Sequence, residues 1–337
     1  MVRLKEVAAL AGVHPATASR ALNPQTAPKV KAATLERVKA AALELDYRVN
    51  TQAANLRKKR SGLIGVVMRD FTNMMLPIMF KGIEDRLRKS GYVALLGTTY
   101  ADADRKRDLY RTFMDRRVDG MIVTYADRID EDLERVRSAR VPSVLINRST
   151  LSGGESRVLP DIAIAMTQIV DHLAGFGHTE FGYIAGPENS AMSDRKSEAF
   201  RAAIGRHELH VGEERMVRPV LATDDEGERI ALRLLTQHPE LTALVCSNDL
   251  LAIGALRAAA KLGLGCPKDI SVSGFNDIPF LDRIEPPLTT ASIPHYEMGY
   301  AAAERLVREI AGERDLESEI VFPSSIVVRR STGPVRA

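Results

Sequence analysis

Positively charged side chains are concentrated at the beginning of the chain. Residues 1–60 contain twelve Lys and Arg against four Asp and Glu, whereas the rest of the chain contains 35 and 40. The chemistry that such a segment favours is electrostatic binding of phosphate groups. A basic head on an acidic body indicates a phosphate-binding module joined to a separate regulatory domain. The alternative is a solvated basic face without a partner.

Residues suited to covalent or metal chemistry form no recognisable pattern. The motifs GxSxG, GxxxxGK[ST] and HExxH are absent. Cys246 and Cys266 have no second Cys or His at zinc-finger spacing, and two cysteines fit a reducing cytoplasm. His172 and His178 are expected to be structural. We therefore expect no enzyme, no bound metal and no cofactor.

The length and hydropathy pattern are those of an intracellular protein. A chain of 337 residues is enough for two or three domains with a large core. No apolar signal segment begins the chain, and no apolar run approaches the length that spans a membrane. We expect a cytoplasmic protein that does not bind a membrane.

Residues 4–23, LKEVAALAGVHPATASRALN, predict two short helices joined by a tight turn. Apolar residues recur there at three- and four-residue spacing. Gly12 suits a chain leaving a helix, and Pro15 suits the first turn of the next one. The small residues Ala8 and Ala18 would let the helices cross closely. This is the sequence form of a helix-turn-helix, with an ordinary helical hairpin as the alternative.

A third helix is expected from about Thr34 to Leu45, closing a small three-helix domain. The stretch that follows, YRVNTQAANLRKKRSG, contains Asn50, which could cap a short helix, and four consecutive cations at Arg57–Arg60. It is interpreted either as an interdomain linker with some helical bias or as a hinge that becomes ordered on DNA.

After residue 61 short apolar runs alternate with amphipathic segments. Such runs predict parallel strands covered on both faces, and two successive series predict two doubly wound halves. Ligands of such folds bind beyond the carboxyl ends of the strands, which places a site in the cleft between the halves. The strands are expected at LIGVVM from Leu63, YVALLGT from Tyr92, GMIVT from Gly120, PSVLI from Pro142, FGYIA from Phe181, ALVCS from Ala243 and ISVSGF from Ile270.

These segments resemble the lactose-repressor (LacI/GalR) family of bacterial transcription regulators over essentially the whole chain. The resemblance is carried by KEVAALAGVHPATASRALN, LELDYRVNTQAANLRKKRSGLIGVV, VPSVLINR, HLAGFGHTEFGYIAGP, SNDLLAIGA, GFNDIPF, PPLTTASIPHYEMGYAA and VVRRST. It implies an N-terminal all-α helix-turn-helix domain and an α/β effector domain of the two-lobe periplasmic-binding-protein fold with doubly wound parallel sheets. It also implies a sequence-specific regulator, most often a repressor, whose partner is double-stranded operator DNA.

The resemblance implies three segments: residues 1–48 for the helix-turn-helix domain, 49–61 for the hinge and 62–337 for effector binding and dimerisation. The inner lobe would comprise about 62–160 and 292–320, and the outer lobe about 161–290 and 321–337. Chain crossings between the lobes are expected near Asn147–Pro160, Pro287–Ile293 and Val321–Ser325.

Transfer of the family's DNA contacts gives three sets of residues. The base-reading positions are Pro15, Ala16 and Arg20, of which only Arg20 has the donor fork that pairs with guanine. Phosphate contacts, which position rather than specify, fall on Thr17, Ser19 and Asn23. The hinge contacts in the minor groove fall on Asn50, Ala53, Leu56 and Arg57, with Leu56 as the wedge between base pairs.

Two departures from the family pattern affect this reading. His14 stands where a Ser or Thr is expected at the cap of the recognition helix, which weakens or alters that cap. Val49 replaces the proline usual at the start of the hinge, so folding of the hinge would depend more on DNA. Specificity is then expected to rely partly on the hinge and on DNA deformability.

The same transfer marks residues of the effector cleft. Arg195, in SDRKSEAF, matches the arginine that grips effector oxygens in the family. The full set is Asp70, Phe71, Asn73, Met75, Leu76, Asn147, Arg148, Arg195, Ala222, Asn248 and Asn276.

Three features favour an anionic effector, such as a sugar acid or sugar phosphate. Asn276 replaces the family's usual Asp and so removes a negative charge, and Arg69 adds a cation near the first strand end. Aromatic stackers are sparse at the positions of Met75, Leu76 and Ala222, which disfavours a flat purine. An uncharged monosaccharide is the alternative.

An effector that prefers the closed cleft would change the angle between paired inner lobes and thereby operator affinity. Whether it induces or co-represses is left open. A homodimer is expected because one head reads only a half-site, and the chain has no heptad-bearing tail of the kind that makes tetramers. The competing hypotheses are a solute-binding protein with a basic leader and a sugar-modifying enzyme on the same fold.

Overall fold

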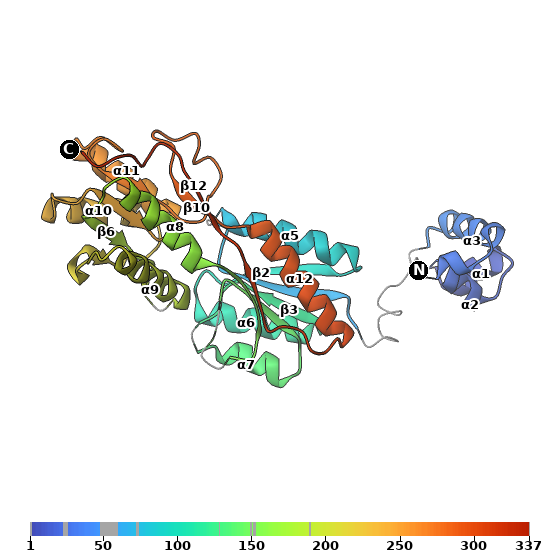
Figure 1. Cartoon of the computed structure of the whole chain (residues 1–337). Helices are drawn as coiled ribbons and strands as arrows, with labels where there is room; N and C mark the ends of the chain where they lie inside the picture. Colours follow the sequence, from blue (N-terminus) through green and yellow to red (C-terminus); the bar gives the residue numbers. More distant parts are fainter. Residues whose placement is uncertain are drawn as a thin grey trace. The chain divides into compact units, whose positions relative to one another are not determined.

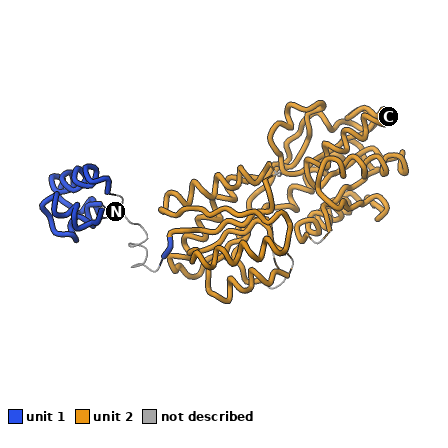
Figure 2. The backbone as a smooth tube through the Cα atoms, turned by 180° about the vertical axis from the view of Figure 1, so that it is seen from behind, with its two compact units in different colours: residues 1–61 blue, residues 62–337 orange. Residues whose placement is uncertain are grey.

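A computed structural model describes residues 2–22, 26–47, 60–71, 74–127, 129–148, 150, 153–188 and 190–336. The chain forms two compact units, residues 1–61 and residues 62–337 (Figure 2). In these described ranges no helix is both long and apolar enough to cross a membrane.

The N-terminal unit is a bundle of short helices, as the spacing of its apolar residues predicts. Its elements are α1 (Leu4–Leu10), α2 (Pro15–Ala21), the 3-10 turn η1 (Ala27–Lys29) and α3 (Ala32–Glu44). Val7, Ala8, Ala18 and Val38 form its core and are almost inaccessible to solvent. Gly12 adopts a φ of +62° between α1 and α2, a conformation that favours glycine. The predicted helix-turn-helix is therefore confirmed.

The inner lobe is built on one parallel six-stranded sheet in the order β11-β5-β4-β3-β1-β2. Helices α5 and α12 cover one face, and α6 and α7 cover the other (Figure 1). The bounds are β1 (Leu63–Met68), α5 (Met75–Lys89), β2 (Val93–Thr98), α6 (Ala103–Asp115), β3 (Gly120–Val123), α7 (Glu131–Ser138), β4 (Ser143–Ile146), β5 (Ser156–Pro160), α12 (His295–Ala311) and β11 (Glu319–Phe322).

The outer lobe repeats this plan around a four-stranded parallel sheet in the order β7-β6-β8-β9. Helices α8 and α9 pack on one face, and α10 and α11 pack on the other. The bounds are α8 (Ile162–Gly175), β6 (Phe181–Ile184), α9 (Ala191–Arg206), η2 (Glu213–Arg215), β7 (Met216–Val217), α10 (Asp224–Gln237), β8 (Ala243–Cys246), α11 (Asp249–Lys261) and β9 (Ser271–Ser273).

The chain passes between the lobes three times. The first passage follows β5, which stays in the inner sheet to Pro160, so most of the predicted Asn147–Pro160 crossing lies within the inner lobe. The other two passages contain β10 (Thr290–Ser292) and β12 (Ser325–Val327), which pair antiparallel. Because β11 pairs with β5 through Phe322, the inner lobe extends two residues past the expected boundary at 320.

Helices α5 and α12 approach each other backbone to backbone. A Cβ atom on Gly82 would lie 2.1 Å from the carbonyl oxygen of Tyr296, and one on Gly299 would lie 2.1 Å from that of Met79. No side chain fits at either position, because real Cβ contacts are never that short. The two glycines therefore set the distance between helices that are far apart in the sequence.

Substituting Gly299→Ala is expected to lower the free energy of unfolding by about 1–3 kcal/mol, because the helices must separate to admit the methyl group. Gly205→Ala is the matched control, since that glycine also lies in a helix and its Cβ would meet nothing within 4 Å. The control should leave stability unchanged or raise it by about 0.5–1 kcal/mol. Urea unfolding measures both changes, and equal effects would contradict the close approach.

Candidate functional site

The second helix of the N-terminal unit presents a polar face to solvent. Ala18 and Ala21 are buried against the other helices, whereas Ala16, Ser19 and Arg20 are exposed. Pro15 and Thr17 are half-buried. The Nε atom of Arg20 donates to the carbonyl of Ala16 at 3.3 Å, which holds the side chain along the helix. Its terminal nitrogens retain the donors that a guanine edge requires.

His14 does cap this helix, although it is not one of the usual capping residues. Its Nδ1 accepts a hydrogen bond from the backbone N–H of Ala16 at 3.2 Å. The backbone of His14 is extended, as a capping residue requires, and Pro15 occupies the first helical position. The expectation of an altered cap is thus confirmed: a ring nitrogen takes the place of a hydroxyl oxygen.

Six predicted site residues lie outside the described residues: Asn23, Asn50, Ala53, Leu56, Arg57 and Asn73. Their proposed contacts with DNA or effector remain predictions.

The carboxyl ends of strands from both sheets carry the predicted cleft residues. In the inner lobe, Arg69 and Asp70 follow β1, Tyr125 follows β3, and Asn147 and Arg148 follow β4. The corresponding segments of the outer lobe follow β8 and β9.

Arg148 is the central cation of the inner lobe. Its Nη1 donates to the carbonyl of Asn147 at 2.7 Å, and among the described residues it forms no ion pair. Burial lowers the pKa of Arg148, Tyr125 and Asp127 oppose the shift, and the Arg69 guanidinium adds to it. The charged side chain of Arg148 is therefore held in an environment that an anion would improve.

Lys196, on α9, is the matching cation of the outer lobe. It is only 9% exposed, donates to the carbonyl of Ser247 at 2.8 Å, and lies 3.9 Å from the ring centroid of Phe275. Burial lowers the pKa of Lys196 to about 7, with Asp249 opposing the shift and Arg148 adding to it. Arg148, from the opposite lobe, is the smallest of these three effects on the pKa of the lysine.

Asp249 connects the outer lobe to a passage between the lobes. Its carboxylate accepts hydrogen bonds from the Thr290 hydroxyl at 2.5 Å and the Ile278 N–H at 3.0 Å. Burial raises the pKa of Asp249 to about 6. The carboxylate therefore forms its hydrogen bonds with local partners, while its charge attracts Lys196 without an ion pair.

Asn276 and His295 lie together beside Lys196. Asn276 is buried, with a φ of 119°, and its N–H donates to the carbonyl of Ala291 at 2.8 Å. His295 is 4% exposed, and burial lowers its pKa to about 4, so that its ring is neutral near pH 7. With an amide at 276 and a neutral imidazole at 295, no negative charge is added next to the lysine.

The other predicted cleft residues differ in accessibility. Phe71 is 49% exposed, whereas Leu76 is buried in the hydrophobic core. Met75 and Ala222 are half-buried. The side chain of Asn248 caps α11 by accepting from the N–H of Leu251 at 2.8 Å.

Arg195 is not the buried cation of α9. It is exposed, and the adjacent Lys196 points inward in its place. The reason is helical periodicity: Ser193, Lys196 and Phe200 share the buried face of α9, and Arg195 lies off it. Lys196 lies four residues before the apolar Phe200, and this helical spacing was the sequence signal that could have identified it. Lys196 is therefore added to the candidate site, and the effector contact of Arg195 stays a prediction.

Sequence reasoning also missed Tyr125. This residue is half-buried beside Arg69 and Arg148, and both cations act on the pKa of its hydroxyl, which burial raises. Together with exposed Phe71, it gives the cleft more aromatic surface than the sequence alone suggested. Its position one residue after Thr124, in the turn that leaves β3, was the available signal.

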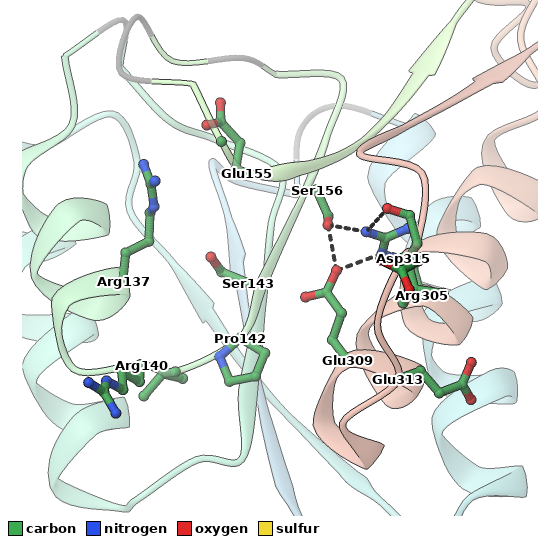
Figure 3. Close-up of a pocket in the computed structure, with 13 residues that line it drawn as sticks. Arg137, Arg140, Pro142, Ser143, Glu155, Ser156, Arg305, Glu309, Glu313 and Asp315 are labelled. Carbon is green, nitrogen blue, oxygen red and sulfur yellow. Dashed lines mark hydrogen bonds and ion pairs between the residues drawn. The ribbon is translucent and has the colours of Figure 1, made fainter.

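A separate hollow of about 470 Å³ lies at the opposite edge of the inner sheet, at the amino ends of β4 and β5. Figure 3 shows Arg305 linked there to Ser156 and Glu309. Arg305 is 9% exposed and also donates to the backbone carbonyl of Glu317. Its donors are occupied by the protein itself, so this cluster holds α12 to the sheet.

Two further expectations concern histidines and metals. His178 is buried and bonded to Thr242 at 2.9 Å and Ser271 at 3.0 Å, and His172 contacts Thr332 at 2.9 Å. Both are structural, as predicted. Within the described ranges, no group of three His, Cys, Asp or Glu could hold a metal ion.

Comparison with known proteins identifies the family. Residues 3–50 match the bacterial regulatory proteins of the lacI family, and residues 170–332 match the periplasmic binding protein-like domain. The HTH-type transcriptional regulator reg1 of Streptomyces lividans is 35% identical over 339 residues, covering 98% of this chain and 96% of the relative. MalR of Streptomyces coelicolor matches to the same extent. The chain belongs to the lacI family and is a DNA-binding transcriptional regulator.

Solved structures agree with this assignment. The lac repressor dimer bound to operator and the anti-inducer ONPF matches with a TM-score of 0.86 and 26% identity, covering 98% of this chain and 99% of that one. The complex of the transcriptional regulator CelR with cellobiose matches with a TM-score of 0.76 and 27% identity, covering 98% and 100%. The predicted family and fold class are therefore confirmed.

The depressed pKa of Lys196 predicts a pH-dependent effect of Lys196→Met on stability. The folded protein binds the lysine proton only below about pH 7, whereas the unfolded chain binds it up to its ordinary pKa of 10.5. The stability of the wild type therefore rises with pH between these values, by about 1.4 kcal/mol per pH unit. The free energy of unfolding that Lys196→Met gains over the wild type should be largest at about pH 7, and this gain should shrink by about 2 kcal/mol or more by about pH 9. Chemical unfolding measures it, and a constant difference would contradict the buried lysine.

Proposed function

We propose that this regulator is a repressor that binds a palindromic operator as a homodimer and is controlled by an anionic carbohydrate in the cleft. The observation that carries the effector assignment is a pair of cations on opposite lobes, half-buried Arg148 and buried Lys196. Among the described residues neither forms an ion pair. A carboxylate or phosphate placed between them would replace their mutual repulsion by two attractions.

The remaining groups of the cleft suit the rest of a sugar. Asn147 has a buried side-chain oxygen that accepts no hydrogen bond, and hydroxyl groups are the donors it would take. Tyr125 and Phe71 offer ring faces against which a sugar can pack, and the Asp70 carboxylate beside them is paired with Arg69 at 3.4 Å. Asn248 keeps its amide N–H donors, because only its oxygen caps α11.

A neutral sugar is the second candidate effector. It is favoured by the matched CelR structure, a complex with cellobiose, and by a lacI-family regulator from Enterococcus faecium with bound ribose. The latter is 26% identical, covers 81% of this chain and 100% of that one, and has a TM-score of 0.72. Neither candidate changes the proposed mode of control.

Control follows from the linkage between cleft closure and DNA binding. A ligand that contacts Arg148 and Lys196 together stabilises the closed cleft, because it binds the two lobes at once. In a dimer this changes the geometry of the paired inner lobes, from which the linkers to the N-terminal units emerge. The operator must then change effector affinity by the same factor.

The effector assignment predicts the outcome of a thermal-shift screen. Gluconate and glucose 6-phosphate should raise the unfolding temperature of the wild type more than glucose, ribose or cellobiose do. Lys196→Met should abolish the shift caused by the anionic sugars, because it removes one of the two cations. Arg206→Met is the matched control and should keep the shift, since it removes an exposed cation from the last position of the same helix. Stabilisation by neutral sugars alone would defeat the anionic assignment and support the second candidate.

The proposed hinge contact predicts how Leu56→Ala affects DNA binding. Loss of the wedge should weaken binding to the operator by about tenfold or more, because the central base step is no longer held open, while binding to unrelated duplex changes little. Leu43→Ala is the control, since that leucine is 85% exposed on α3. Fluorescence anisotropy with the two duplexes measures both affinities, and equal losses on both would contradict the wedge.

A further inference from the structure

Three exposed arginines follow helices of the inner lobe and lie at the amino ends of the strands of its sheet, an edge formed by the turns that precede β3 and β4. Arg116 caps α6, Arg117 follows it with a φ of 53°, and Arg140 lies after α7 with a φ of 58°. All three are exposed, and none forms an ion pair with another described residue. By contrast, Arg107 and Arg135 on the same helices pair with Asp residues three positions earlier.

The linker from the N-terminal unit reaches the body on this same edge. The N–H of Gly62 donates to the Asp119 carboxylate at 2.8 Å, and its carbonyl accepts from Val93 at 2.9 Å. Asp119 belongs to the turn that carries Arg116 and Arg117. Because β1, β3 and β4 are successive neighbours about 4.8 Å apart, the turn of Arg140 lies about 10 Å from the linker.

Charge is unevenly distributed along the edge. The helix ends and turns before β2, β3 and β4 carry Arg88, Lys89, Arg116, Arg117 and Arg140. The acids there are Asp115, Asp119 and Asp85, of which Asp85 pairs with Arg88. Farther along, the segment before β11 is acidic, with Glu313, Asp315 and Glu317. The basic half is therefore the half that receives the linker. We call the surface formed by Arg116, Arg117 and Arg140 the linker-side arginine cluster.

The length of the linker between the two units limits how far DNA bound by the N-terminal unit can lie from the body. Residues 48–61 join the two units and span at most about 50 Å even when fully extended. Both tethered surfaces are positive, since residues 1–60 also carry an excess of cations. Duplex DNA is a polyanion with one charge per about 1.7 Å of its axis, and a basic surface of the body within reach of it can bind its phosphates.

We propose that the linker-side arginine cluster binds backbone phosphates of the duplex that the helix-turn-helix holds. It forms a second, sequence-independent DNA contact made by the effector-binding body itself. The inference rests on operator binding by the N-terminal unit. Because the contacts are to phosphates, they strengthen binding to all sequences alike and add to its salt dependence.

The test compares the full-length wild type with the triple variant Arg116→Gln, Arg117→Gln and Arg140→Gln. The control variant, Arg206→Gln, Arg233→Gln and Lys268→Gln, removes the same number of charges from exposed positions of the outer lobe. The duplexes are a palindrome selected by the wild type from random sequence and a scrambled version of it. Anisotropy titrations over a range of KCl concentrations give the affinity and its salt slope, and thermal unfolding gives stability.

The cluster variant should lose about tenfold or more in affinity for both duplexes, and its salt slope should fall by about 2 to 3. The ratio of specific to non-specific affinity, the unfolding temperature and the behaviour of the control variant should stay as in the wild type. An unchanged slope in the cluster variant would overturn the proposal while leaving operator binding intact. A lower unfolding temperature with an unchanged slope would show that the arginines only cap their helices. A wild type that selects no palindrome would overturn the proposed function, and this inference with it.

Discussion

The repulsion between Arg148 and Lys196 is the interaction on which the account of the cleft depends. Lys196 is buried and Arg148 is half-buried, each donates to a backbone carbonyl, and each belongs to a different lobe. The nearby Asp249 accepts hydrogen bonds from Thr290 and Ile278, and its charge also attracts Lys196 without forming an ion pair with it. Under the proposed function, closing the cleft brings the two cations closer together at an electrostatic cost, and a bound anion would offset that cost.

Such a switch works only if each lobe moves as a unit. At Gly82 and Gly299 the backbones of α5 and α12 are in direct contact, which prevents one helix from sliding along the other. Arg305 in turn holds α12 to the sheet through Ser156. Both helices belong to the inner lobe, as do the turns next to the linker. Changes at the cleft are thus expected to reach the opposite edge of the inner sheet as a displacement of the whole lobe rather than as local deformation.

Much of the secondary structure could be predicted from the sequence, because it depends on local patterns of apolar and turn-forming residues. The seven apolar runs became strands, and Gly12 and Pro15 marked the turn between α1 and α2 correctly. Short strands such as β7 and β10 were missed because they have too few residues to show a period. Lys196 was missed for a different reason: motif matching chose the arginine beside it, whereas burial is decided by the helical face that Phe200 shares.

The charge coupling across the cleft can be measured directly by a double-mutant cycle on the free energy of unfolding, using Arg148→Met, Lys196→Met and the double variant at about pH 6. Each single substitution removes the same repulsion, so the account predicts that the double variant gains less stability than the sum of the single variants, by about 0.5 kcal/mol or more. Strict additivity would contradict the proposed repulsion, because the two cations would then be independent. The cleft would in that case gain nothing from an anion bound between them.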